Sequence, residues 1–190
     1  MPLGNRAKTD ELSVTYLNPV YALGTTYVQL AEEVAEGVSG VNTAIDGTLL
    51  AGERTWMFVK AAAAITAGAL CKINATVAPF NVAVDAASET DAYLLRGVAD
   101  HAIASGSYGW IIVDGTCVIS AALTSAAGAI VLGSIVASDG NTVPGSVDIY
   151  VFTPGATSIA PLVAVALEAE GAGAAYGVGF VQARIAARLG

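Results

Sequence analysis

The chain's only histidine lies close in sequence to a serine and an aspartate, the side-chain types of a hydrolytic triad. Residues 101–115 read HAIASGSYGWIIVDG and contain His101, Ser107 and Asp114. In such a triad the histidine takes the serine proton and the aspartate orients the imidazole. A hydrolase elbow has the form Gly-x-Ser-x-Gly on a turn from strand to helix, but Ser105 stands two positions before Ser107 and a strand-like run follows. We therefore predict a β-hairpin, with Ser107 at its bend and a solvated His101, and not an active site.

Other groups that could do chemistry are also isolated. Acid–base catalysis needs two carboxyls in one cleft with different pKa values, which no acidic pair here suggests; the pairs are Glu32 with Glu33 and Glu168 with Glu170. Residues 139–141 read DGN but lack the remaining ligands of a calcium loop. The glycine-rich run at 171–179 has no phosphate-gripping lysine. The sequence predicts a protein that is not an enzyme and holds no cofactor or metal.

The composition points to a protein whose surface is covered by partners. The 190 residues are 55% hydrophobic and only 13% charged, about half the charged fraction of an average globular domain. The net charge is −8, and no Lys or Arg occurs between Gly97 and Ala183. Binding to nucleic acid requires clustered basic residues that release counterions. We therefore expect no nucleic-acid partner.

Residues 115–138 contain no charge and would satisfy a hydropathy window for a membrane span. They are flanked by Asp114 and Asp139 with no basic anchor, contrary to the positive-inside pattern. The first twelve residues have no apolar core of a secretory signal. We expect a soluble protein with no membrane partner. Cys71 and Cys117 are expected to be free thiols, although spacing alone leaves a disulfide open.

The first 50 residues are predicted to be an N-terminal arm and connecting segment. Residues 1–24 are interrupted by turn formers, and their apolar residues are too sparse for a core element. Residues 30–38 have the spacing of a short helix. A β-rich domain is expected over residues 51–190.

That domain shows a recurring unit of strand end, small-residue turn and new strand. Residues 53–61, ERTWMFVKA, alternate as a strand does. Residues 64–70 (AITAGAL) resemble residues 102–108 (AIASGSY), and residues 122–130 look like the same unit with two extra residues. Closely spaced turn signals follow, including Asp114-Gly115. The predicted fold is mainly β, a compact barrel or sandwich of short antiparallel strands with an extended N-terminal arm.

The order of these motifs is similar to that of small tailed-bacteriophage virion proteins that decorate or cement the capsid. The similarity covers residues 53–186 and is clearest from Arg96-Gly97-Val98-Ala99 to the run SYGWIIVDG at 107–115. Such a resemblance implies a non-enzymatic β-rich subunit, usually a homotrimer, that binds the major capsid protein on the outer surface of the virion. The alternative is a ligand- or carbohydrate-binding β module of a phage head fibre or tail. Sugar platforms need exposed aromatics, and both Trp56 and Trp110 lie in strand-like runs.

Two features suggest how such a subunit would make its contacts. Residues 162–167 read LVAVAL, so both faces of this predicted strand are apolar; one can pack in the core and the other against a neighbouring subunit. The arm carries a quarter of the basic residues together with apolar and aromatic ones. The candidate capsid-contact residues of the arm are Arg6, Lys8, Tyr16 and Tyr21. Whether the arm or the domain makes the main capsid contact stays open.

Overall fold

The computed structural model describes residues 12–30, 53–73, 80–84, 95–123, 130, 133–138, 147–149, 162–166 and 177–185. Every regular element in these ranges is a β-strand, which confirms the predicted mainly β fold. The strands are β1 (Thr26–Gln29), β2 (Arg54–Ala61), β3 (Leu70–Ile73), β4 (Asn81–Val84), β5 (Leu95–Ala99), β6 (Tyr108–Leu123), β7 (Ile135–Ser138), β8 (Val147–Ile149), β9 (Leu162–Ala166) and β10 (Gly177–Ile185). The helix predicted at 30–38 lies outside the described residues except for Leu30.

The first group of strands closes into a ring, here called barrel 1. The order of pairing is β2-β4-β3-β5-β6, and β6 pairs back onto β2. All pairings are antiparallel except that of β2 with β4. One buried cluster takes side chains from all five strands, including Val59, Cys71, Val82, Ala99 and Ile111. Alternate residues of each strand therefore fill the barrel interior, as the period of two requires.

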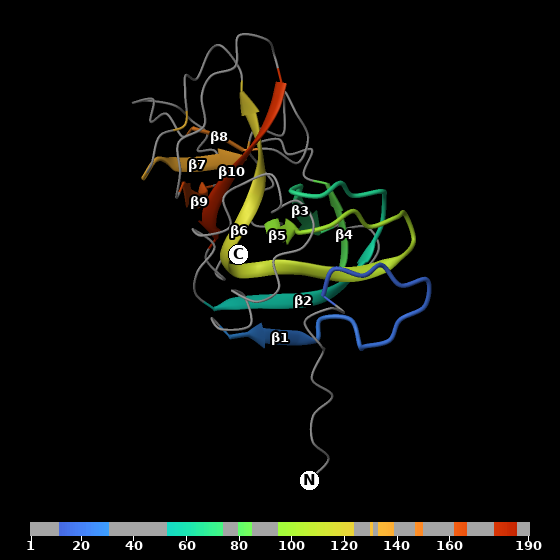
Figure 1. Ribbon diagram of the computed structural model, residues 1–190. Coiled ribbons are helices and arrows are strands. Elements are labelled where there is room, and N and C mark those ends of the chain that lie inside the picture. The colour runs from blue at the N-terminus through green and yellow to red at the C-terminus, as the bar shows by residue number, and fades with distance from the viewer. Residues whose placement is uncertain are drawn as a thin grey trace.

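The second group of strands, barrel 2, has the same plan. Its ring is β6-β8-β7-β9-β10, closed by β10 onto β6, with β6 and β8 parallel and the other pairings antiparallel. The last strand of barrel 1 continues directly as the first strand of barrel 2. In Figure 1 β6 runs along β2 and then turns to run beside β10. One long strand thus joins two barrels.

The registers show that barrel 2 repeats barrel 1. In β3 and β4, Cys71 is paired with Val84 and Ile73 with Val82; in β7 and β8, the residues 65 positions later pair in the same way. The pairing of β3 with β5 has a register shift after its second residue, and so has the pairing of β7 with β9. The two barrels are tandem copies of one structural unit.

The recurring turn predicted from the sequence is present in both barrels. Gly68 and Gly106 have positive φ angles of 76° and 79°, and Ile65 and Ile103 bond reciprocally through their backbones at 2.9 Å. Gly133, φ 84°, also stands two residues before a strand, β7, whereas residues 124–129 of the predicted third instance lie outside the described residues. The N–H of Gly68 donates to the carbonyl of Ala99 in β5 at 2.7 Å, and the N–H of Gly133 donates to the carbonyl of Ala166 in β9 at 2.9 Å. The required feature is a glycine in the left-handed region two residues before a strand.

Asp114-Gly115 is a bend within β6 and not the turn that the sequence suggested. Gly115 has a φ of 102°, and a Cβ atom there would lie 2.3 Å from the carbonyl oxygen of Glu53. Arg54 is opposite Gly115 in the register. Glycine allows the strand to bend while β2 remains close.

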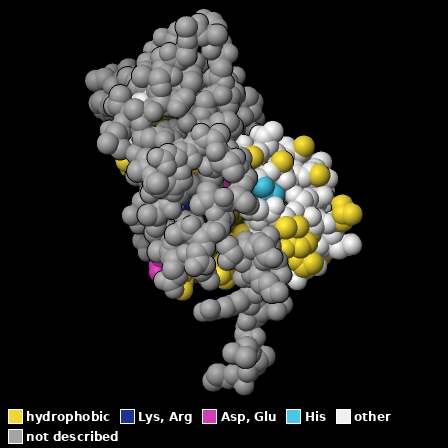
Figure 2. Space-filling view, in the orientation of Figure 1, with side chains coloured by type: hydrophobic (Ala, Val, Ile, Leu, Met, Phe, Trp, Pro, Cys, Tyr) yellow, Lys and Arg dark blue, Asp and Glu magenta, His cyan; other side chains and the backbone are white. Residues whose placement is uncertain are grey.

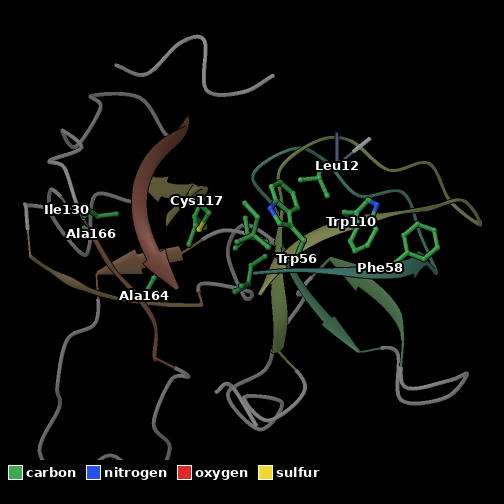
Figure 3. Close-up of a cluster of buried hydrophobic side chains, with 12 residues drawn as sticks. Leu12, Trp56, Phe58, Trp110, Cys117, Ile130, Ala164 and Ala166 are labelled. Carbon is green, nitrogen blue, oxygen red and sulfur yellow. The ribbon is translucent and has the colours of Figure 1, made fainter. Parts of the chain in front are cut away.

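A second buried cluster lies across both barrels. It includes Trp56, Phe58 and Trp110 of barrel 1, and Cys117 and Ile119 of the second half of β6. Figure 3 shows the large aromatic side chains near one end of this cluster and the alanines of β9 near the other. The two barrels therefore share a hydrophobic core.

Part of the predicted arm belongs to this core. Leu12 is 1% exposed, and Tyr16, Tyr21, Leu23 and Tyr27 pack against the cluster. The prediction that apolar residues here are too sparse for a core element is wrong, because all five of these residues are tyrosine or leucine, whose large side chains need only one neighbouring sheet. Residues 12–24, hereafter the strap, lie along barrel 1 and lead into β1.

Candidate functional site

The structure does not bring the triad-type residues together. Strands β5 and β6 form a hairpin in which Val98 pairs with Ile112, which confirms the hairpin prediction for residues 97–115. Ser107 directly precedes β6, and Asp114 lies seven residues further along the same chain direction. At roughly 3.3 Å per residue, this separation is about 23 Å. No proton transfer between these two side chains and an intervening histidine is possible over that distance.

His101 is largely buried, so the prediction of a solvated histidine is wrong. A Cβ atom on Gly109 would lie 3.3 Å from its Nε2 atom, and neither ring nitrogen has a hydrogen-bond partner in the described structure. Burial lowers the pKa of His101, while the nearby backbone of Val14 acts weakly in the opposite direction. The imidazole is therefore a neutral packing group beneath the strap.

Backbone and side-chain hydrogen bonds hold the strap to this hairpin. Tyr16 and Tyr108 exchange two backbone hydrogen bonds of 2.8 Å. The hydroxyl of Thr15 donates to the carbonyl of Ala102 at 3.0 Å. At its other end, the N–H of Gly24 donates to the carbonyl of Phe58 at 2.8 Å. The strap is thus fixed to both β2 and the start of β6.

Aromatic contacts account for two of the predicted capsid-contact residues. The Tyr21 ring lies 5.1 Å from Trp110 and 5.4 Å from Phe58, and Tyr16 lies 6.0 Å from Phe58, all edge-on. Edge-to-face pairs at these distances are attractive. Tyr16 and Tyr21 therefore stabilise the fold, and both keep part of their surface exposed. Arg6 and Lys8 lie outside the described residues, and contact of any of the four with a capsid remains a prediction.

A buried cation lies where the barrels meet. Arg54 is 4% exposed and is paired with Gly115 at the bend of β6. Burial lowers the pKa of Arg54, while the charges of Asp100 and Cys117 favour its charged form. Its Nε and Nη2 atoms have no hydrogen-bond partner in the described structure. No local pattern in the sequence predicts this arrangement, because Arg54, Asp100 and Cys117 are far apart along the chain. Cys71 and Cys117 are both buried and neither forms a disulfide, as expected for reduced thiols.

Within the described ranges, no group of three or more His, Cys, Asp or Glu side chains could hold a metal ion. The described chain also contains no helix with the length and hydropathy to cross a membrane. The charge-free segment 115–138 contributes instead to β6 and β7.

Exposed apolar side chains occur in two places. On barrel 1 they are in the strap and β1: Val14 is 42% exposed, Leu17 84%, Val20 52% and Val28 50%. On barrel 2 they are Ile135 of β7, 47% exposed, and Val165 of β9, 43% exposed. Figure 2 shows hydrophobic side chains on the face of the molecule that also carries the histidine. These two groups make up the exposed large apolar side chains of the described residues.

Comparison with known proteins gives only weak structural likenesses. No protein-family model matches the chain. No curated protein sequence matches it. Among solved structures, it is similar to one titled "The crystal structure of head fiber gp8.5 N base in bacteriophage phi29", with 13% sequence identity and a TM-score of 0.43. The matched region covers 70% of this chain and 93% of that one.

Proposed function

We propose that the chain is a non-enzymatic virion protein that binds the outside of an icosahedral phage capsid as a homotrimer and stabilises the shell. The proposal starts from the sequence resemblance to capsid-decorating proteins. It is carried by one observation: residues 96–115, the stretch most similar to those proteins, form part of the buried structural core. A Cβ atom on Gly97 would lie 2.2 Å from the carbonyl oxygen of Ile112, and Trp110 is 1% exposed. The shared residues therefore specify a fold and not a reactive site.

The charge distribution supports a position away from packaged nucleic acid. The chain has a net charge of −8, which disfavours contact with a polyanion. The exposed apolar residues on both barrels support contact with protein neighbours, because large exposed apolar areas mark interaction sites.

The alternative, a carbohydrate-binding module, has less support. A sugar platform needs an exposed flat aromatic ring, and Trp56 and Trp110 are only 2% and 1% exposed. The partly exposed tyrosines of the strap have rings packed edge-on against Phe58 and Trp110. No described aromatic ring is offered face-on at the surface by these contacts.

The proposal is tested by light scattering on the purified protein and by co-sedimentation with undecorated phage shells. We expect a trimer at micromolar concentration and saturable binding to shells. Ser107→Ala is the matched control. If Ser107 has only a structural role, its hydroxyl can be removed without loss of shell binding, whereas removal of a catalytic hydroxyl would abolish an enzymatic activity. A monomer, or a trimer that stays in the supernatant with every shell tested, would overturn the proposal.

A further inference from the structure

The duplication allows each position of barrel 1 to be compared with its counterpart in barrel 2. Leu70 of β3 pairs with Val98 of β5, and in the same register Ile135 of β7 pairs with Val165 of β9. Both members of the barrel 1 pair are 0% exposed. The barrel 2 pair is 47% and 43% exposed. The same apolar position is covered in one barrel and open in the other.

Barrel 2 supplies part of the cover over barrel 1. The backbone N–H of Ser120, in the second half of β6, donates to the carbonyl of Gly68 at 2.8 Å. Leu70 and Val98 belong to the same buried cluster as Ile119 of that half. In barrel 1 this face is therefore an interface with another copy of the same structural unit.

The turn beside the open pair is open as well. Gly133 is exposed, whereas its counterpart Gly68 is buried. Along β9, Ala164 and Ala166 are buried at 8% and 1%, and Val165 between them is exposed. Neither β7 nor β9 contains a charged residue. The outer face of β7 and β9 can thus be buried without removing a charge from water, which would be costly.

We propose that a second copy of this chain docks on the outer face of β7 and β9, centred on Ile135 and Val165. The inference rests on the proposed oligomer and specifies one of its contact surfaces. A second copy is favoured over the capsid protein as the occupant because the equivalent face of barrel 1 is covered by a barrel from this same chain. A barrel of a second copy would continue this packing of one structural unit on the next.

The docking is of the head-to-tail kind. An isologous contact, in which the β7–β9 face meets itself, generates a dimer with two-fold symmetry. A ring of three requires that the face of one copy meet a different surface of the next. The side chains of Ile135 and Val165 would then lie near the centre of each contact, where substitution has the largest effect on affinity.

The first experiment is the pair of single variants Ile135→Glu and Val165→Glu, studied by light scattering at micromolar concentration. Each places a charge on a face that the assembly buries, so we expect at least about a tenfold weaker association, as for a buried contact residue. Ser105→Glu is the control, because Ser105 is exposed in the turn before β6 and lies outside both groups of exposed apolar residues. It should leave the assembly unchanged.

A second experiment does not depend on introducing a charge. The two native cysteines are buried, so Val165→Cys and Ser105→Cys each add one accessible thiol. In the assembled protein we expect Val165→Cys to react with a maleimide at least about tenfold more slowly than Ser105→Cys, and dilution to the monomer should remove the difference. Equal labelling rates in the assembly would overturn the inference, even if a glutamate variant had failed to fold.

The outcomes separate this inference from the proposed function. If the wild-type protein is a trimer and binds shells but both glutamate variants remain trimers, the docking face is wrong and the proposed function stands. If those variants remain trimers and lose only shell binding, the face contacts the capsid, which also overturns the inference. A wild-type monomer would overturn the trimer and the docking face together.

Discussion

Trp56 and Trp110 are both buried, but the described structure gives a partner to only one of the two indole N–H groups. Nε1 of Trp56 donates to Oε1 of Gln29 at 2.9 Å, and Gln29 is itself 3% exposed. Nε1 of Trp110 has no hydrogen-bond partner in the described structure. Replacing each tryptophan by phenylalanine should therefore lower the free energy of unfolding by different amounts.

We expect Trp56→Phe to lower the free energy of unfolding by about 1–3 kcal/mol more than Trp110→Phe. Both changes remove the same atoms, but only the first leaves a buried glutamine oxygen without its donor. Urea unfolding of the two variants measures the difference. Trp110→Ala, which also removes the ring that contacts Phe58 and Tyr21, should cost about 3–5 kcal/mol. Equal costs for the two Phe variants would contradict the assigned hydrogen bond.

His101 should make the stability of the protein depend on pH. Burial holds the pKa of His101 below its ordinary value of 6.5, so the unfolded chain binds a proton more readily than the folded one. Stability is fully present above pH 6.5 and is lost as the pH falls through the lowered pKa of the folded protein. Carboxylates also titrate at low pH, and His101→Gln is the control that isolates the histidine. The fall in urea midpoint below pH 6.5 should be smaller in this variant; parallel profiles would mean that the ring is solvated.

At the scale of the strand, the bend in β6 depends on Gly115. Its φ is 102°, and an added Cβ would lie 2.3 Å from the Glu53 oxygen and 3.0 Å from Cα of Arg54, both backbone atoms. Gly106 has a φ of 79° and nothing within 4 Å of an added Cβ. The two positions share the backbone conformation and differ in the space around it.

We expect Gly106→Ala to cost about 1–2 kcal/mol, the usual cost of left-handed backbone for a residue with a Cβ. Gly115→Ala should cost at least twice as much, because β2 must also move away from the bend. Chemical unfolding measures both, and circular dichroism at low denaturant checks that each variant is folded. A Gly115→Ala variant as stable as Gly106→Ala would show that β2 is not held against the bend.

Much of the strand pattern was predictable from local sequence. Alternation in residues 53–61 and the glycine turns at Gly68 and Gly106 are local signals, and both were interpreted correctly. The continuation of β6 through Gly115 was not predictable. An Asp-Gly pair occurs both in turns between strands and in bends within one strand, and here only the pairing with β2 distinguishes the two. The burial of Leu12 and of the His101 ring nitrogens likewise depends on packing between the strap and barrel 1, which are far apart in the sequence.

At the scale of the whole molecule, the duplication explains the unusual composition. The interior of barrel 1 is filled by alanine, valine, isoleucine and cysteine side chains, and few charged residues are needed where outer faces are also covered. The strap and barrel 2 cover much of barrel 1. The exposed pair on β7 and β9 is the equivalent area that the chain itself leaves open. Low charge and small side chains are therefore consequences of one architecture.

The structure also changes how the arm hypothesis must be tested. Deleting residues 1–22 would remove Leu12, Tyr16 and Tyr21 from the core and would destabilise barrel 1. Deleting residues 1–10 removes Arg6 and Lys8 and leaves the strap intact. If the basic residues hold the trimer to the shell, this shorter deletion should leave trimer formation and urea stability unchanged.

Binding to undecorated shells should then fall by about 10² or more, because three arms on one trimer act together. The double variant Arg6→Ala with Lys8→Ala should reproduce most of this loss in the full-length chain. Lys72→Ala, which removes one positive charge from β3 of barrel 1, is the control for net charge and should bind as the wild type does. Co-sedimentation at several salt concentrations measures all three, since screening weakens contacts between exposed charges. Undiminished binding by the 1–10 deletion would assign the capsid contact to the barrels and not to the arm.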